Sequence, residues 1–249
     1  MNGILYHGEP NGPSLTVLAA AFEKGVELTL ERIDLVAGER HGARAPHAFE
    51  VEQSIEGEGP VLVVDGVAMA DSVFVACYLD DTGDGPALRP ADPYARWQAM
   101  AWCRYVIERI APAASYLGLS AAPPAAVPAG IASQDLADRW REAVEGRFDA
   151  AKLDDSRAKI AQGVEKVEAQ LADGRAWLMG DFGIADLESY SWLAGMPALH
   201  PDAFADRPRT AAWLDRVRTR PSVSRALALA TVAEPSAVWA PGPEINRWG

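Results

Sequence analysis

The fold is decided by residues 59–72, which read GPVLVVDGVAMADS. Asp65-Gly66 stands between two short apolar runs, and such a dipeptide supplies the positive backbone φ angles of a tight two-residue turn. The pattern predicts an antiparallel hairpin. Asp71-Ser72 then offers a cap to the short apolar helix that follows. The segment therefore predicts strand, strand and helix in that order.

The N-terminal residues predict a parallel unit of strand, helix and strand. Residues 4–7 are a short apolar run, and the cluster 9–13 holds two prolines and a glycine, which end that run in a turn. Ser14 is a good N-cap for the helix that follows, and Gly25 stands where a left-handed C-terminal cap falls. Apolar and polar residues alternate over 26–30, as in a half-buried strand.

From Pro93 onward the sequence shows helical periodicity and no convincing strand. We expect helical regions at residues 99–110, 134–172 with a break at 154–156, 185–196, 208–219 and 221–231. Together with the N-terminal pattern, this predicts an α/β domain at residues 1–82 and an all-helical domain at residues 90–249.

The composition is that of an ordinary folded chain with an acidic balance. The 249 residues include 23 Lys+Arg and 35 Asp+Glu, which gives 23 − 35 = −12 at pH 7. Because this charge leaves no basic field for phosphate groups, we expect neither nucleic acid nor a membrane as a partner. No apolar run approaches the roughly 20 residues that span a bilayer. The first residues lack the pattern of a signal peptide, and we expect a cytoplasmic protein.

Several chemistries find no motif in this sequence. It lacks the glycine-rich loops that hold nucleotides, the paired histidines of zincins and the G-x-S-x-G of hydrolases. Cys77 and Cys103 form no CxxC pair, which fits a reducing compartment. His41 and His47 lie in residues 35–53, an irregular connection, and we expect solvated loop histidines there rather than metal ligands. No metal is expected.

The first turn is one candidate site. It places Asn11 and Ser14 at the N-terminus of a helix, where unpaired N–H groups and the helix dipole favour an anion such as a thiolate. Ser14 has a second interpretation as a simple helix cap, and Asn11 as a simple turn residue. The residues alone leave both interpretations open.

A second candidate site combines Gly59-Pro60, at the entry to the hairpin, with Asp71-Ser72 at a helix start. Each pair also has a purely structural interpretation. Pro60 suits an ordinary trans turn, and Asp71-Ser72 suits a helix cap.

These features together resemble the cytosolic glutathione transferases, which combine an α/β thioredoxin-like N-terminal domain with an all-α C-terminal domain. In that family a cis-proline opens the third strand, and GEGPVL at residues 57–62 looks like that element. The resemblance implies that glutathione is the cofactor. Backbone groups at Gly59 and Pro60 would hold its cysteine, and Asp71 and Ser72 would bind its γ-glutamyl end.

Shorter strings are similar to those of the bacterial lignin β-aryl-etherases within this family. They are LRPADPY at residues 88–94 and Leu5-Tyr6 with Ser14-Leu15 around the first turn. GIADL at 183–187 resembles the capping box of the family's buried C-terminal helix, and RPSV at 220–223 resembles its late Arg-Pro turn. Three positions depart from the pattern: Gly59 stands where related enzymes often carry a bulkier residue, Pro13 stands where the etherases carry Asn, and Gly183 replaces a hydroxyl residue.

The resemblance implies a glutathione transferase of the β-etherase type that serves lignin degradation. Ser14, or Asn11, would stabilise the glutathione thiolate, which attacks the carbon bearing an aryl ether beside a ketone and expels a phenolate. The small aromatic ether substrate would lie between the domains, near aromatic residues of the first long helix. These residues, for which core or subunit contact is the alternative interpretation, are Tyr94, Trp97, Trp102 and Tyr105.

Two other functions stay open. Pro13 and Gly59 are compatible with a weakly active or non-catalytic subunit of a heterodimeric etherase, and a transferase that acts on other electrophiles is the third possibility. The resemblance implies a homodimer, or a heterodimer with a related glutathione transferase. The tail at residues 234–249, with Trp239 and Trp248, either covers the pocket or packs as an ordered terminus.

Overall fold

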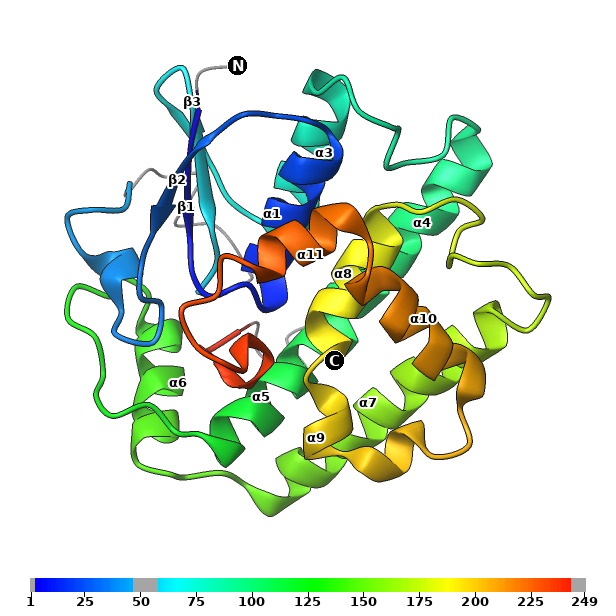
Figure 1. The fold of residues 1–249 in the computed structure, drawn as a ribbon. Helices are drawn as coiled ribbons and strands as arrows, with labels where there is room; N and C mark the ends of the chain where they lie inside the picture. The colour runs from blue at the N-terminus through cyan, green and yellow to red at the C-terminus, as the bar shows by residue number, and fades with distance from the viewer. Residues whose placement is uncertain (1–2, 47–57, 243–249) are drawn as a thin grey trace.

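The computed structural model describes residues 3–46 and 58–242, and it places a four-stranded sheet beside a larger group of helices (Figure 1). The chain begins with β1 (Gly3–His7), α1 (Gly12–Glu23) and β2 (Thr29–Arg32). β1 and β2 pair in parallel, as predicted. The second strand starts later than expected because the turn at Gly25, with φ 64°, still belongs to the end of α1.

The hairpin prediction is confirmed. β3 (Val61–Val64) and β4 (Val67–Met69) pair antiparallel, and the two turn residues Asp65 and Gly66 have φ 51° and 83°. β3 also pairs antiparallel with β1, so the strand order is β2-β1-β3-β4. The result is the mixed sheet that a βαβ unit followed by a hairpin produces.

Two helices complete the N-terminal part. α3 (Ser72–Thr82) follows the hairpin, and α1 packs against α3, α8 (Ile184–Leu193) and α11 (Pro221–Leu227). The first ten residues of α1 are all buried. A helix that is buried on every side belongs to the centre of a molecule, and α1 therefore joins the sheet to the helical part.

The start of α1 corrects one expectation. The helix begins at Gly12, and its N-cap is Asn11, with extended φ −142° and ψ 156° and no side-chain cap bond. Ser14 thus lies inside the first turn and is not the N-cap. Pro13 favours this arrangement, because a proline in the first turn lacks an N–H that would have no helical partner there.

The first long helical region runs from Pro93 to Ala121 in three parts: α4 (Pro93–Tyr105), a π-helical segment η2 (Val106–Ile110) and α5 (Ala111–Ala121). It is longer than predicted. Pro112 lies just after the π-helical segment, and a proline cannot donate the backbone bond that a regular helix requires at that point.

The predicted break at residues 154–156 is wrong. The chain breaks instead between α6 (Gln134–Val144) and α7 (Ala150–Gln170), where Gly146 has φ 64° and Asp149 caps α7 through Lys152 N–H. Residues 154–156 stay helical because Asp154 and Asp155 form ion pairs with side chains one turn further along.

The remaining elements are short helices around a buried centre. They are η1 (Glu39–His41), α9 (Met196–Leu199), η3 (Pro201–Phe204), α10 (Pro208–Arg218) and η4 (Pro235–Ala237). Every residue of α8 is buried. Arg220 Nε and Ser222 Oγ donate to Glu23 at 3.1 and 2.6 Å, which fixes the start of α11 against the end of α1.

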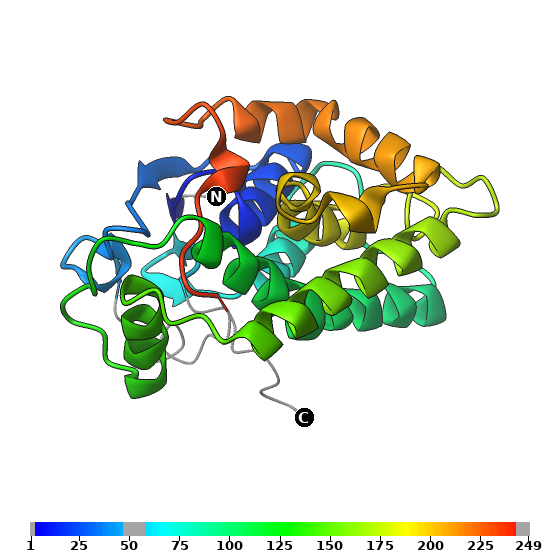
Figure 2. The same ribbon diagram turned by 90° about the horizontal axis from the view of Figure 1, so that it is seen from below.

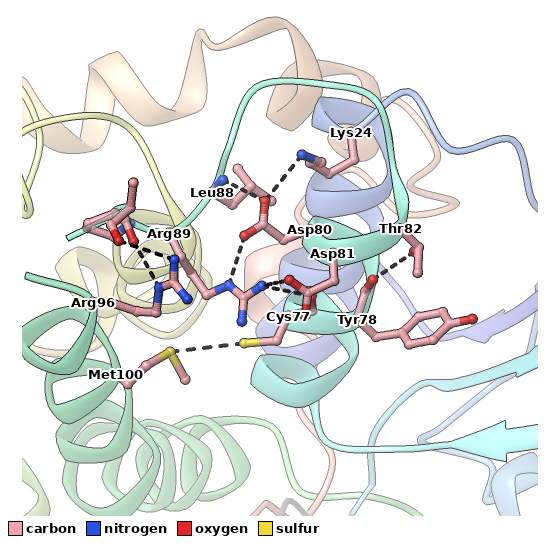
Figure 3. Close-up of polar contacts among 12 residues, drawn as sticks. Lys24, Cys77, Tyr78, Asp80, Asp81, Thr82, Leu88, Arg89, Arg96 and Met100 are labelled. Atoms are coloured by element: carbon pink, nitrogen blue, oxygen red, sulfur yellow. Dashed lines mark hydrogen bonds and ion pairs between the residues drawn. The ribbon is translucent and has the colours of Figure 1, made fainter. Parts of the chain in front are cut away.

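Asp80 fixes the connection between the sheet part and the helical part, as Figure 3 shows. Its carboxylate accepts from Leu88 N–H and Arg89 Nε, each at 2.8 Å, and pairs with Lys24 at 3.2 Å. Burial raises the pKa of Asp80, but the bonds from Arg89, Leu88 and Lys24 outweigh burial and hold that pKa below its usual value. Lys24 also donates to Gly85 O at 2.7 Å, so the connection is tied to the end of α1.

Across residues 3–46 and 58–242, no helix has both the length and the apolar character required to cross a bilayer.

Candidate functional site

The first turn of α1 separates the two residues predicted to meet a thiol. Asn11 is 8% exposed, and its Nδ2 donates to Val238 O at 3.0 Å. Its Oδ1 has no hydrogen-bond partner among the described residues. Ser14 is fully buried, and its Oγ accepts from Gly8 N–H at 3.0 Å. The two side chains therefore have different surroundings, although they share one turn.

A cavity lies beside Asn11. Its walls come from the turn before α1, the segment after β2, α8 and the C-terminal segment. The residues that line it are Glu9, Asn11, Gly12, Pro13, Arg32, Ile33, Asp34, Leu35, Val36, Glu58, Trp192, Val238, Trp239, Ala240 and Gly242. Ser14 is not in this set of described residues. Asn11, rather than Ser14, is the predicted residue that reaches the cavity.

Glu58 belongs to this site, and the sequence analysis missed it. Its Oε1 accepts from Trp140 Nε1 at 2.7 Å and bonds to His41 Nε2 at 2.6 Å. The Glu58 side chain is fully buried, and the His41 side chain is only 7% exposed. The expectation that His41 is a solvated loop residue is therefore wrong. His47 lies outside the described residues. The sequence signal that could have pointed to Glu58 is its position directly before the Gly59-Pro60 pair.

Gly59 and Pro60 are buried and lead directly into β3. The resemblance implied a cis bond at this position. The Gly59–Pro60 bond is trans, which corrects that expectation and matches the isomer that most X–Pro bonds adopt.

Asp71 and Ser72 begin α3. Asp71 is the N-cap residue, with φ 69°, and makes no side-chain cap bond. Ser72 is fully buried, and its Oγ donates to Glu188 Oε2 at 3.1 Å. The Ser72 hydroxyl therefore points to α8, and the binding of a γ-glutamyl group by this pair stays a prediction.

Glu188 is a second residue that the sequence analysis missed. Besides Ser72, its carboxylate accepts from Thr16 Oγ1 at 2.9 Å and from Trp192 Nε1 at 2.7 Å. Burial raises the pKa of Glu188, and the bonds from Trp192, Thr16 and Ser72 oppose that rise. This carboxylate thereby connects α1 and α3 to an indole in the cavity wall. Nothing in its local sequence marks it, because its partners lie far away in the chain.

None of the four aromatic residues predicted to bind substrate is among the described residues that line this cavity. Tyr94 and Trp97 are 65% and 61% exposed and stack on each other at 5.7 Å. Trp102 Nε1 donates to Ser189 Oγ at 2.8 Å, and the half-buried Tyr105 ring lies 5.3 Å from Lys166 Nζ. Burial raises the pKa of Tyr105. The four therefore divide into an exposed pair and a packed pair.

The start of α8 explains one departure from the family pattern. A Cβ atom on Gly183 would lie 2.3 Å from Leu88 O, so a hydroxyl residue does not fit there. Asp186 accepts from Leu178 N–H at 3.0 Å, Gly183 N–H at 3.2 Å and Trp213 Nε1 at 2.8 Å. Burial raises the pKa of Asp186 to about 6. Asp186 thus fixes the helix start through the backbone N–H of Gly183, and no side chain at residue 183 takes part.

The C-terminal segment forms one wall of the cavity. Trp239 is 5% exposed and stacks on Trp192 with ring centroids 6.3 Å apart. Its indole lies so close to α5 that a Cβ atom on Gly118 would be 2.2 Å from Trp239 Cγ. Figure 2 shows this segment, in red, passing alongside the green helices. The tail is therefore packed and lines the cavity as far as Gly242, and Trp248 lies outside the described residues.

The chain's own thiols do not suit a nucleophile. Cys77 and Cys103 are free, and burial raises the pKa of both. The described residues contain no cluster of three or more His, Cys, Asp or Glu side chains that would hold a metal. The first-turn N–H groups of α1 suit an anion such as a thiolate.

Comparisons with known proteins agree with this geometry. Residues 120–221 match the family model of the glutathione S-transferase C-terminal domain. The chain is 27% identical over 244 residues to the protein LigF of Sphingobium sp. strain SYK-6, with 88% of this chain and 90% of LigF covered. The crystal structure of the β-etherase LigF from that strain superposes with a TM-score of 0.80 at 25% identity, covering 92% of this chain and 99% of that one.

A glutathione transferase structure from Burkholderia graminis, with two glutathione molecules bound per subunit, superposes with a TM-score of 0.67 at 21% identity. The superposition covers 92% of this chain and 88% of the Burkholderia graminis chain. These likenesses and the mixed four-stranded sheet confirm the predicted fold. The chain has the glutathione transferase fold, and its residues 120–221 match the model of the glutathione S-transferase C-terminal domain.

Proposed function

We propose that this chain is a glutathione-dependent β-etherase that cleaves aryl ethers of lignin-derived aromatic ketones. The glutathione thiolate attacks the carbon that bears the aryl ether oxygen, a C–S bond forms, and the C–O bond breaks. The thiol proton ends on the released phenol, so that the products are a glutathione thioether and a phenol. The nucleophile comes from the co-substrate.

One observation carries this proposal: a chain similar to a β-etherase over most of its length has a cavity at the N-terminus of α1, and this cavity is lined by Asn11, whose buried carbonyl oxygen has no hydrogen-bond partner among the described residues. That oxygen accepts the hydrogen bond of a thiol, and the helix N-terminus stabilises the thiolate once it forms. The Ser14 hydroxyl already accepts from Gly8 N–H. We therefore rank Asn11 above Ser14 for contact with the thiol.

Glutathione lies, in this proposal, along the edge formed by β3 and the start of α3. Backbone groups of Gly59 and Pro60 hold its cysteine, and its γ-glutamyl end meets the N-terminus of α3 at Asp71 and Ser72. Unpaired N–H groups at a helix start suit the carboxylate of that end. A reducing, cytoplasmic compartment suits the reaction, because glutathione acts as the free thiol.

The exposed aromatic residues are assigned to a subunit contact rather than to substrate. Phe74 on α3 is 68% exposed, and Tyr94 and Trp97 on α4 are exposed to a similar degree. α3 and α4 lie side by side, since Cys77 Sγ contacts Met100 Sδ at 4.0 Å (Figure 3). Neighbouring exposed aromatic side chains are typical of protein interfaces. The partner is a second copy of this chain or a related glutathione transferase.

The test is phenol release from a racemic β-aryl-ether ketone dimer by the purified chain, with and without glutathione. Release that requires glutathione supports the proposal, and a plateau at half conversion shows that one stereoisomer is selected. Release only after a related chain is added identifies a subunit of a heterodimeric etherase. Conjugation of a chloro-aromatic compound without ether cleavage identifies a transferase for other electrophiles.

A further inference from the structure

A second cavity lies among α8, α9, α10, α11 and residues 230–236, which Figure 1 draws in yellow to red. It encloses about 590 Å³, a size that suits a small molecule. Asn11 is the one described residue that lines both this cavity and the first one. The proposed reaction therefore leaves this space without a role.

The walls of the second cavity are mostly aliphatic. Leu15 is 1% exposed, and the more exposed Leu214, Leu227 and Val232 line the same space. Tyr190 is the one aromatic residue among the described residues that do so. Burial of CH2 groups against such walls is favourable, whereas a ligand ring finds little to stack on. The walls therefore favour an alkyl chain.

Tyr190 offers a hydroxyl to a molecule in this cavity. The residue is 5% exposed, and its ring packs edge-on against Trp213 with centroids 6.5 Å apart. The hydroxyl makes no hydrogen bond within residues 3–46 and 58–242, yet it is not among the fully enclosed polar atoms, as the hydroxyl of Tyr105 is. Because Tyr190 lines the cavity, a ligand there can reach this hydroxyl. Buried hydroxyl groups are nearly always bonded in folded proteins, and a ligand would supply the partner.

Arg218 adds positive charge beside that hydroxyl. It is the one basic residue among the described residues that line the cavity, and its guanidinium makes no ion pair with a described acid. Burial raises the pKa of Tyr190 to about 12, Arg218 opposes that rise, and Asp215 adds to it more weakly than Arg218 opposes it. The Tyr190 hydroxyl therefore stays a donor, and the stronger of the two charges that act on it is positive.

The charged side chains also determine how a ligand would be oriented. Asp215, Arg218 and Glu234 are all exposed, so they lie where the cavity meets solvent. A charged ligand group that stays there keeps part of its hydration, and its apolar part enters the cavity. A carboxylate accepts from Arg218 and Tyr190 together, since a guanidinium presents several donors to it.

We propose that this cavity binds a medium-chain fatty-acid anion, whose carboxylate accepts from Tyr190 Oη and from the Arg218 guanidinium. Its alkyl chain packs on Leu15, Leu214 and Leu227. The site is separate from the cavity of the etherase reaction and does not depend on that activity.

The experiment measures the binding of octanoate, 1-octanol and benzoate to the purified full chain by calorimetry at neutral pH. Octanoate is expected to bind about tenfold more tightly than 1-octanol, because only octanoate carries the charge that pairs with Arg218. Benzoate has the charge without the alkyl chain, and it is expected to bind about tenfold more weakly than octanoate. Saturating glutathione is expected to leave octanoate binding unchanged, because glutathione occupies the first cavity.

Three variants test the carboxylate contacts. Arg218→Gln is expected to weaken octanoate about tenfold and to leave 1-octanol unchanged. Asp215→Asn is the matched control at the same helix, and it is expected to tighten octanoate about twofold, because it removes a repelling charge. Tyr190→Phe is expected to weaken octanoate about fivefold. Its melting temperature is expected to stay the same, since the hydroxyl has no bond to lose.

Equal affinity for octanoate and 1-octanol overturns the inference, as does no binding of either. Octanoate affinity that Arg218→Gln preserves, or that Asp215→Asn lowers as much as Arg218→Gln does, overturns the carboxylate contact. Benzoate that binds as tightly as octanoate overturns the alkyl class, and competition by glutathione places octanoate in the first cavity. Absence of phenol release in the etherase assay rejects only the etherase activity, whereas absence of octanoate binding rejects only this site.

Discussion

Glu188 in α8 accepts a hydrogen bond from Ser72 Oγ at 3.1 Å, although the two residues are 116 positions apart in the chain. The same buried carboxylate accepts from Thr16 in α1 and from Trp192 in the cavity wall. A side chain on the helical part thereby fixes the start of α3, the middle of α1 and one wall of the cavity. In the proposed function, this group holds the glutathione region and the electrophile region in register.

Glu188→Ala is expected to lower the free energy of unfolding by about 3–5 kcal/mol, because three buried donors lose their acceptor. Glu188→Gln keeps one acceptor oxygen, and we expect a loss of about 1–2 kcal/mol. Urea unfolding followed by tryptophan fluorescence measures both. Glu165→Ala, on the exposed side of α7, is the control. A loss in Glu188→Ala no larger than in this control would show that the network adds no stability.

The raised pKa of Asp186 predicts a pH dependence of stability. The folded chain keeps this proton up to about pH 6, whereas an unfolded aspartate releases it near pH 4. Between these values the folded state binds more protons, so the stability contributed by Asp186 falls as pH rises from about 4 to 6 and is constant above. A difference of about two pKa units between the folded and unfolded states corresponds to roughly 3 kcal/mol of stability.

Asp186→Asn lacks this titration and isolates it. The stability difference between the unaltered chain and Asp186→Asn is expected to be larger at pH 4 than at pH 7, by up to about 3 kcal/mol. Urea unfolding of both chains at several pH values gives that difference directly. A difference that does not change with pH would mean that the pKa of Asp186 is not raised in the folded chain.

Single substitutions in the first turn of α1 separate the two thiol candidates. Asn11→Ala is expected to lower kcat about tenfold, equivalent to about 1.4 kcal/mol of barrier, since Asn11 lines the cavity and its Oδ1 has no partner among the described residues. Ser14→Ala is expected to lower stability by about 1–3 kcal/mol through the loss of an acceptor for Gly8 N–H, with little change in kcat. Rates are measured at saturating glutathione. If neither variant loses about tenfold, the thiol lies elsewhere.

The proposed subunit face predicts the effect of charge on assembly. Phe74→Asp combined with Trp97→Asp is expected to convert a dimer into a monomer, because both side chains are more than half exposed and removing them from water drives the contact. Sedimentation velocity measures the change. The melting temperature of the isolated chain should stay about the same, since neither ring belongs to its core. A variant that still sediments as a dimer places the interface on another face.

The close approach of α5 to the C-terminal segment predicts a steric effect. Gly118→Ala puts a methyl group 2.2 Å from Trp239 Cγ, so the indole must move. The expected loss is about 1–3 kcal/mol, together with a red-shifted tryptophan emission. In a Trp239→Ala background the same change is expected to cost far less, and the double-mutant cycle gives the coupling. Equal costs in both backgrounds would show that Trp239 does not pack on Gly118.

Much of the fold follows from local sequence. The Asp65-Gly66 turn is predicted because those two residues adopt the required positive φ values, and the structure has φ 51° and 83° there. The sequence pattern predicts a helix break at residues 154–156, whereas the structure has the break after α6. Capping by Asp149 and the left-handed Gly146 decide the position of the break, and Asp155 lies inside α7, where it forms an i to i+4 ion pair with Lys159.

The candidate site follows from sequence only in part. Asn11, Gly59 and Pro60 are close to the cavity or to its walls, and they were found because a turn and a strand entry mark them. Glu58 and Glu188 were not assigned roles, because each has partners contributed by distant segments. His41 and Trp140, for example, meet at the Glu58 carboxylate from different parts of the chain.

The sequence by itself determined the backbone pattern of this protein: a βαβ unit, a hairpin and a helical second half. Turn residues, caps and apolar periodicity act over a few neighbouring positions, so they can be read locally. Tertiary structure decided which residues line the cavity. That choice depends on burial and on bonds such as Asn11 to Val238, 227 positions away, and no local pattern encodes them.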